Sequence, residues 1–211
     1  MRMERYRKII WENLRHFFLL PLLTATGIFL VTALMFNLSA LSEREAAKPI
    51  EFFLSFAGVM LLTPVFYPEQ NQELRDVISS KRTSYLVVCA LRVVCSVAAA
   101  AVLVTLFAGL LKWNESAVTN AHSYGGLATA VFLGAIGFCV AGITDNTTLG
   151  YMAAVLYYLL NYGMKDRLGK FYLFSMSAGR FEGKEWLFSG ALVLIAGTFA
   201  VLFFRRKRWG Y

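Results

Sequence analysis

The stretch Tyr85–Leu111, YLVVCALRVVCSVAAAAVLVTLFAGLL, runs for 27 residues with Arg92 as its one charged side chain. At 1.5 Å per residue a helix of this length is about 40 Å long, which exceeds the hydrocarbon core of a bilayer, about 30 Å thick. Its apolar residues are continuous and do not alternate with a period of two, which favours a helix over a strand of a membrane barrel. The stretch therefore predicts a transmembrane helix.

Five more apolar runs, of 18 to 22 residues each, accompany it. Hydrophobic residues make up 58% of the 211-residue chain and charged residues 16%, against roughly 45–50% and 25% in soluble proteins. This composition excludes a soluble enzyme, a secreted disulfide scaffold and a disordered tail. We predict an all-α integral membrane protein with a single transmembrane domain, 1–211, and six transmembrane helices. Their expected ranges are 17–38, 50–67, 85–111, 124–143, 147–164 and 186–204.

The net charge of +8 is distributed as in membrane proteins. Five basic residues precede the first apolar run and four follow the last, which predicts that both termini are cytoplasmic in a multi-pass protein of the cell membrane. No basic stripe alternates with aromatic residues, so nucleic acid is not an expected partner, whereas the lipid bilayer is. The five basic residues within 165–184 disagree with the charge rule, because the predicted topology puts them outside.

Two segments outside the predicted spans have apolar character of their own. Residues 1–16 place Tyr6, Ile9, Ile10 and Leu14 at helical spacing, which predicts an amphipathic helix along the cytoplasmic interface, with a plain basic anchor as the alternative. The segment Lys165–Glu185 contains the apolar run 171–174, FYLF, which is too short to span. We expect a re-entrant or interfacial element there, before the last span.

The cytoplasmic connection Pro68–Ser84, PEQNQELRDVISSKRTS, has the most informative pattern outside the spans. Glu69 to Ser80 can form a helix of about three turns, with its acidic residues near the start, where they favour the helix dipole. Leu74, Val77 and Ile78 then form a small apolar ridge that a peripheral partner could bind. A solvated turn that rests on its own bundle is the alternative interpretation.

This connection, with its Glu69-x3-Glu73-Leu74-x3-Ile78-Ser79-x-Lys81-Arg82-x-Ser84 pattern before a long span, resembles the first cytoplasmic loop of the permeases of type-2 ABC exporters. Six spans, cytoplasmic ends, an N-terminal interfacial helix and a long fifth loop resemble that family as well. The resemblance implies a short coupling helix that docks on an ATP-binding subunit. The ATPase-coupling residues would be Glu69, Glu73, Leu74, Val77 and Ile78.

The resemblance also implies a second permease copy, or a related permease, as partner. The permease would export a hydrophobic or amphipathic substrate, such as a peptide, a lipid or a drug. ATP and Mg²⁺ would be bound by the partner subunit, and no cofactor by this chain. The alternatives are a stand-alone channel, a secondary transporter, or a membrane scaffold or sensor that transports nothing.

Few polar residues interrupt the apolar runs. Arg92, in the third run, either extends toward the cytoplasm or contacts a transport path, because an unpaired charge in hydrocarbon is costly. Asn161, in the fifth run, can bond across helices or contact a ligand. Glu51 stands only at a span edge, which disfavours a secondary transporter. His16 and His122 fall at opposite membrane faces, so neither a metal site nor a catalytic site is expected.

Overall fold

The computed structural model describes residues 18–70 and 85–209. These residues form helices and connections and contain no strand, which confirms the all-α class for this part of the chain. The predicted helix over 1–16 and residues 71–84 of the predicted coupling loop lie outside the described residues. Six helical segments are described, namely α2 (Leu19–Met35), α3 to α5 (43–70), α7 (Tyr85–Trp113), α8 (Asn120–Thr144), α9 (Thr147–Met164) and α10 (Lys184–Trp209).

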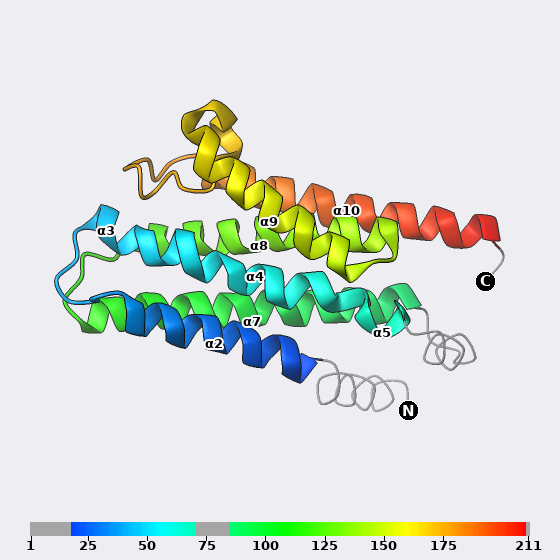
Figure 1. Cartoon of the computed structure of the whole chain (residues 1–211), viewed down its shortest axis with the longest axis horizontal. Coiled ribbons are helices and arrows are strands. Elements are labelled where there is room, and N and C mark those ends of the chain that lie inside the picture. Colours follow the sequence, from blue (N-terminus) through cyan, green and yellow to red (C-terminus); the bar gives the residue numbers. More distant parts are fainter. Residues whose placement is uncertain (1–17, 71–84, 210–211) are drawn as a thin grey trace.

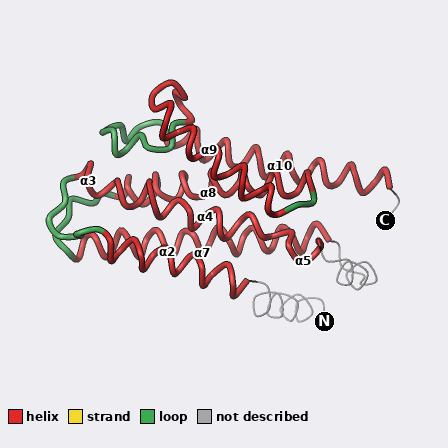
Figure 2. The backbone as a smooth tube through the Cα atoms, in the orientation of Figure 1, coloured by secondary structure: helices red, strands yellow, loops and turns green. Residues whose placement is uncertain are grey.

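The six segments run along a common direction in three tiers (Figure 1). The segments α4 and α8 form the middle tier, between α9 and α10 on one side and α2 and α7 on the other. The connections 36–42, 114–119 and 165–183 gather at one end of the bundle, here called the distal end (Figure 2). The start of α2, the end of α5, the start of α7, the α8–α9 turn and the end of α10 lie at the other, proximal end.

The second segment departs twice from α-helical geometry. It begins as α3 (Glu43–Lys48), continues as the π-helix η2 (Pro49–Leu54) and α4 (Ser55–Leu62), and ends as the 3₁₀-helix η3 (Thr63–Phe66) and α5 (Tyr67–Gln70). Pro49 and Pro64 stand at the two departures, because proline lacks the N–H that a continuous α-helix needs. Two side chains of α7 donate hydrogen bonds to backbone carbonyls at and just before η3. Ser96 donates to the Leu61 carbonyl at 2.8 Å and Arg92 donates to that of Val65 at 2.9 Å.

Glycines bring α8 against the backbones of its neighbours. A Cβ at Gly134 of α8 would lie 2.5 Å from the Gly58 carbonyl oxygen of α4, and a Cβ at Gly58 would overlap the Ala130 carbonyl. A Cβ at Gly150 of α9 would lie 2.5 Å from the Gly137 oxygen of α8. Such close approach is typical of helices that pack in a membrane through small residues. The helix α8 is therefore the central element of the bundle.

Four helical stretches of the described chain are long and apolar enough to cross a membrane. They are Glu43–Phe66, Leu86–Trp113, Asn120–Thr144 and Lys184–Arg205, which makes a multi-pass membrane protein plausible. The helix α2 is apolar but only 17 residues long, and α9 has 18 residues but is less apolar. The helix bounds lie close to the predicted ranges, except that the second segment begins at Glu43 rather than at 50.

The close contact between α4 and α8 predicts a size limit at Gly58. We expect Gly58→Ala to lower the free energy of unfolding by about 1–3 kcal/mol, because the added methyl group overlaps backbone and not a flexible side chain. The purified chain can be melted in detergent while a thiol-reactive dye reports the exposure of Cys89, which is buried.

Gly27→Ala in α2 is the matched control, since a Cβ there meets nothing within 4 Å. We expect its unfolding temperature to equal or slightly exceed that of the native chain. Equal melting of the two variants would contradict the close α4–α8 contact.

Candidate functional site

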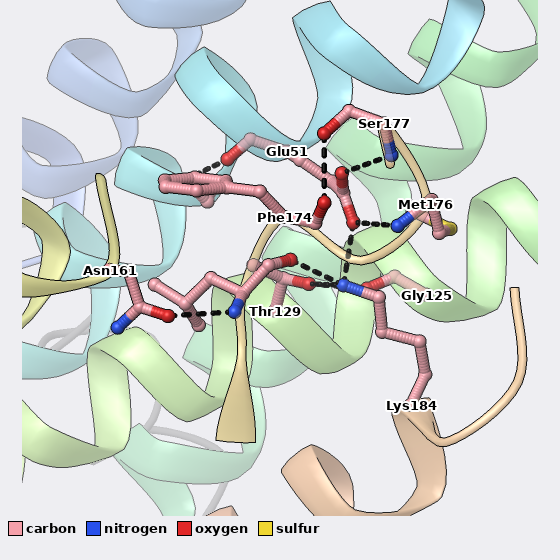
Figure 3. A network of polar contacts seen from close by, with 10 residues as sticks. Glu51, Gly125, Thr129, Asn161, Phe174, Met176, Ser177 and Lys184 are labelled. Carbon is pink, nitrogen blue, oxygen red and sulfur yellow. Dashed lines mark hydrogen bonds and ion pairs between the residues drawn. The ribbon is translucent and has the colours of Figure 1, made fainter. Parts of the chain in front are cut away.

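An ion pair is buried inside the distal end of the bundle. The Nζ atom of Lys184, the first residue of α10, lies 2.6 Å from Oε1 of Glu51 in η2. The two side chains are 2% and 0% exposed. Figure 3 shows them pointing toward each other from two separate elements. Both charges are shielded from water and lipid, so their stability depends on what else contacts them.

The ammonium group of Lys184 has a full set of acceptors. It donates to Oγ1 of Thr129 in α8, at 2.9 Å, and to the carbonyl oxygen of Leu173, in addition to Glu51. Thr129 donates its own hydroxyl hydrogen to the Gly125 carbonyl at 2.8 Å. Because an ammonium group has three hydrogens, these three acceptors satisfy it completely.

The carboxylate of Glu51 binds the chain between α9 and α10 as well. The backbone N–H of Met176 donates to Oε1 at 2.9 Å, and that of Ser177 donates to Oε2 at 2.8 Å (Figure 3). Hydrogen bonds to a carboxylate are stronger than those between neutral groups. Glu51 therefore holds residues 176 and 177 and the start of α10 together at one point.

These two amides belong to a single helical turn whose far end is closed by a glycine. Gly179 has φ +83°, a conformation that glycine adopts without a steric penalty. Its N–H donates to the Met176 carbonyl at 2.8 Å, and the N–H of Arg180 donates to the Ser175 carbonyl at 2.8 Å. This pair of hydrogen bonds is the Schellman pattern of helix C-termini. Glu51 thus caps the beginning of the turn and Gly179 closes its end.

The π-helix fixes the direction in which Glu51 points. The wider turn of η2 rotates the residues that follow Pro49 relative to an α-helix, and such turns are frequent at functional sites. Two hydroxyl groups satisfy carbonyls of this turn. Ser55 donates to the Glu51 carbonyl at 2.7 Å, and Tyr158 of α9 donates to that of Phe52 at 3.0 Å. The irregular turn is therefore stabilised from within and from α9.

Asn161, one of the two predicted path residues, belongs to the same network. It is fully buried in α9, donates to the Tyr157 carbonyl at 2.9 Å and accepts the N–H of Leu173 at 2.8 Å. Leu173 is thereby bound on both sides, by Asn161 at its N–H and by Lys184 at its carbonyl. Asn161 binds backbone, which accounts for its polarity without a ligand.

Arg92 does not join this site. It lies near the start of α7, at the proximal end, where its guanidinium contacts the Val65 carbonyl. The structure therefore separates the two predicted path residues by most of the bundle. Of the predicted coupling residues, only the backbone of Glu69 is described, at the end of α5. The remaining four lie outside the described residues: Glu73, Leu74, Val77 and Ile78.

A second ion pair binds the proximal end of α10. Arg205 lies 3.0 Å from Asp145 in the α8–α9 turn, and both side chains are about half exposed. An exposed pair of this kind contributes at most about 1 kcal/mol, whereas breaking a buried pair costs about 3–5 kcal/mol. The stretch Lys184–Arg205 has 22 residues, about 33 Å of helix, which matches the hydrocarbon thickness of a bilayer. The two pairs therefore mark both ends of one membrane-length helix.

The network positions the chain and offers no unused polar atom to a ligand. Every polar group of Glu51 and Lys184 has a partner, and no group of three potential metal ligands occurs among residues 18–70 and 85–209. The sequence indicated Glu51 only as a residue at a span edge and Lys184 only as one of the basic residues of the loop. The one sequence feature that could have indicated the site is Glu51 itself, an acidic residue two positions after Pro49 at the start of an apolar run.

Comparison with known proteins does not add a relationship. No family model matches the sequence, and neither curated proteins nor solved structures yield a similar chain.

The network predicts strong coupling between Glu51 and Lys184. We expect Glu51→Gln and Lys184→Met each to lower the free energy of unfolding by about 3–5 kcal/mol, because each leaves one buried charge without its counter-charge. The double variant should lose clearly less unfolding free energy than the sum of the two single losses, since it leaves no buried charge behind. The measure is the rate of tryptic cleavage in residues 165–183, which carry three exposed basic residues: Arg167, Lys170 and Arg180.

Glu182→Gln serves as the control for charge alone, because Glu182 is exposed in the same segment. We expect native cleavage rates for it. Additive effects of the Glu51 and Lys184 substitutions would show that the two side chains do not act as a pair.

Proposed function

We propose that this chain is the membrane-spanning permease subunit of an ATP-driven exporter that resembles type-2 ABC exporters. All six helical segments cross the cell membrane, and the proximal end faces the cytoplasm. The substrate is hydrophobic or amphipathic, a peptide, a lipid or a drug. ATP and Mg²⁺ bind a separate ATP-binding subunit, and a second permease copy or a related permease completes the membrane part.

The placement of the helix ends carries this proposal. The end of α5 and the start of α7 lie at the same end of the bundle as the start of α2 and the end of α10. The segment Glu69–Ser80 therefore connects two membrane-length helices at the end where both termini are proposed to lie. A short helix with an apolar ridge in that position is where a peripheral ATPase could act on the bundle.

The irregular second segment offers a route from the ATPase to the distal end. It continues from α5 through η3 and α4, where Gly58 contacts the α8 backbone, to Glu51 in η2. Movement of α5 is proposed to reach α8 through the glycine contacts and the start of α10 through Lys184. The proline-associated changes of geometry are where this segment can bend.

The buried acid favours a secondary transporter as the second candidate. Ionisable side chains at membrane depth commonly serve proton or ion pathways. Glu51, however, is bound by Lys184 and two backbone amides, and the nearest described acids of α3 are exposed. A proton pathway needs a series of connected protonatable groups. His122 is also buried at the distal end, but its ring nitrogens are bonded to the Thr119 hydroxyl and the Glu43 carbonyl and not to Glu51. The exporter is therefore preferred.

The coupling proposal is tested by removing the apolar ridge. We expect Leu74→Ala combined with Ile78→Ala to release the ATP-binding subunit or to uncouple its ATP hydrolysis from transport, because truncated apolar anchors cost more than ~1 kcal/mol each at an interface. The measures are co-purification of an ATP-binding protein with the chain and the ATPase activity of the reconstituted complex.

Gln70→Ala combined with Gln72→Ala is the control, since neither residue belongs to the predicted ridge of Leu74, Val77 and Ile78. The control should retain the partner. If the ridge variant binds and hydrolyses ATP like the native complex, this loop is not the coupling element.

The proposed orientation is tested by cysteine labelling in a variant whose three native cysteines are replaced by alanine. Ser39 is exposed at the distal end and Thr148 at the proximal end. We expect a membrane-impermeant maleimide to label Ser39→Cys in intact cells, and Thr148→Cys and Ser79→Cys only after permeabilisation. The reverse pattern would show that the distal end faces the cytoplasm. Labelling of all three positions in intact cells would contradict the proposed placement of the two ends on opposite sides of the membrane.

A further inference from the structure

The helices α9 and α10 both pack on α8 but contact each other little. At the distal end of the bundle the 3₁₀ segment η4 (Lys165–Phe171) contacts both of them. We call this lateral boundary between α9 and α10 the seam. It is proposed to face the bilayer, since both helices carry exposed apolar side chains, such as Leu160 of α9 and Leu192 of α10.

Phe171 closes the distal part of the seam. Its ring stacks on that of Phe132 in α8, with centroids 5.8 Å apart, and its carbonyl accepts the Tyr157 hydroxyl of α9 at 2.8 Å. Gly190 of α10 makes room for both rings, because a Cβ there would lie 2.8 Å from Phe132 and 3.1 Å from Phe171. Phe132 is 5% exposed and Phe171 42% exposed. Phe171 is thus the apolar cover that separates the interior from the lipid side.

Basic residues precede Phe171 in η4. The Nζ atom of Lys170 lies 4.0 Å from the ring centroid of Trp186, which is 49% exposed at the start of α10. Arg167 is exposed in η4 as well, on the other side of a kink at Gly169, where φ is +56°. Neither Lys170 nor Arg167 has an acidic partner within the described part of the chain. A tryptophan beside unpaired cations is typical of side chains at the headgroup level of a membrane.

We propose that the seam binds an anionic phospholipid of the leaflet at the distal end. The phosphate contacts Lys170 and Arg167, and one acyl chain lies along Phe171 between α9 and α10. Each basic residue near an anionic lipid surface contributes measurably to binding, and exposed aromatic rings suit the upper part of an acyl chain. This site also gives a role to two of the five basic residues in the segment 165–184 that the charge rule left unexplained.

The proposal rests on the distal end facing one leaflet and not on the partner ATPase. The full chain is reconstituted separately with two phospholipids that carry a photoreactive diazirine on one acyl chain, phosphatidylglycerol and phosphatidylcholine. Labelled peptides are then identified by mass spectrometry. We expect phosphatidylglycerol to label the peptides around η4 and the first turns of α10 more strongly than phosphatidylcholine does.

The two charges and the cover are tested separately. Arg167→Gln and Lys170→Gln should each lower the labelling by phosphatidylglycerol roughly fivefold and leave that by phosphatidylcholine unchanged. Lys48→Gln with Lys112→Gln removes two exposed basic residues elsewhere at the distal end and should have no effect. Phe171→Ala should move the acyl label onto the α8 peptide that contains Phe132, and Phe171→Leu should not.

Two results would overturn the proposal. One is equal labelling of the seam by both lipids, and the other is unchanged labelling in the Arg167 and Lys170 variants. Loss of the ATP-binding partner, in contrast, would reject the exporter and leave the lipid site standing, because the labelling is measured on this chain alone.

Discussion

The contact between Glu51 and Lys184 determines how the distal end of the bundle is built. It joins the π-helix of the second segment, the first residue of α10 and, through backbone groups, the turn at residues 173–177. Two buried charges are costly to remove from water, and their attraction offsets that cost only when their remaining hydrogen bonds are made. Thr129, Leu173 and the two amides make those bonds. Without the pair, residues 165–183 would lose the ties that bind them to the second segment.

The packed centre of the bundle and the helix α10 are held by different forces. Close backbone contacts through glycine fix α8 against α4 and α9, and such contacts allow little change in distance. The helix α10, by contrast, packs mainly on α8 and is tied at its ends by one buried and one exposed ion pair. In the proposed exporter the packed centre would transmit force, and α10 with the distal segment would be the part that responds.

The sequence predicted the helices better than it predicted the site. Run lengths and flanking charges place most helices well, because burial in lipid depends on composition alone. The start of the second segment was missed because residues 43–48 are polar. Their helix begins with Ser42 donating to Glu45 through its N–H and its hydroxyl group, at 3.2 and 2.7 Å. Glu51 and Lys184 are far apart in the chain, and no local pattern indicates that they pair. Asn161 was expected to bond across helices, but its partner Leu173 belongs to a connection whose path only tertiary packing defines.

Amide hydrogen exchange of the native chain tests the role of the pair most directly. The backbone N–H groups of Leu173, Met176 and Ser177 donate to buried side chains, whereas those of residues 181–183 have no such acceptor in the described part of the chain. We expect residues 173–177 to exchange orders of magnitude more slowly than residues 181–183, and Lys184→Met to remove most of that difference. Fast exchange of 173–177 in the native chain, or slow exchange that survives Lys184→Met, would contradict a distal end held by the Glu51–Lys184 pair.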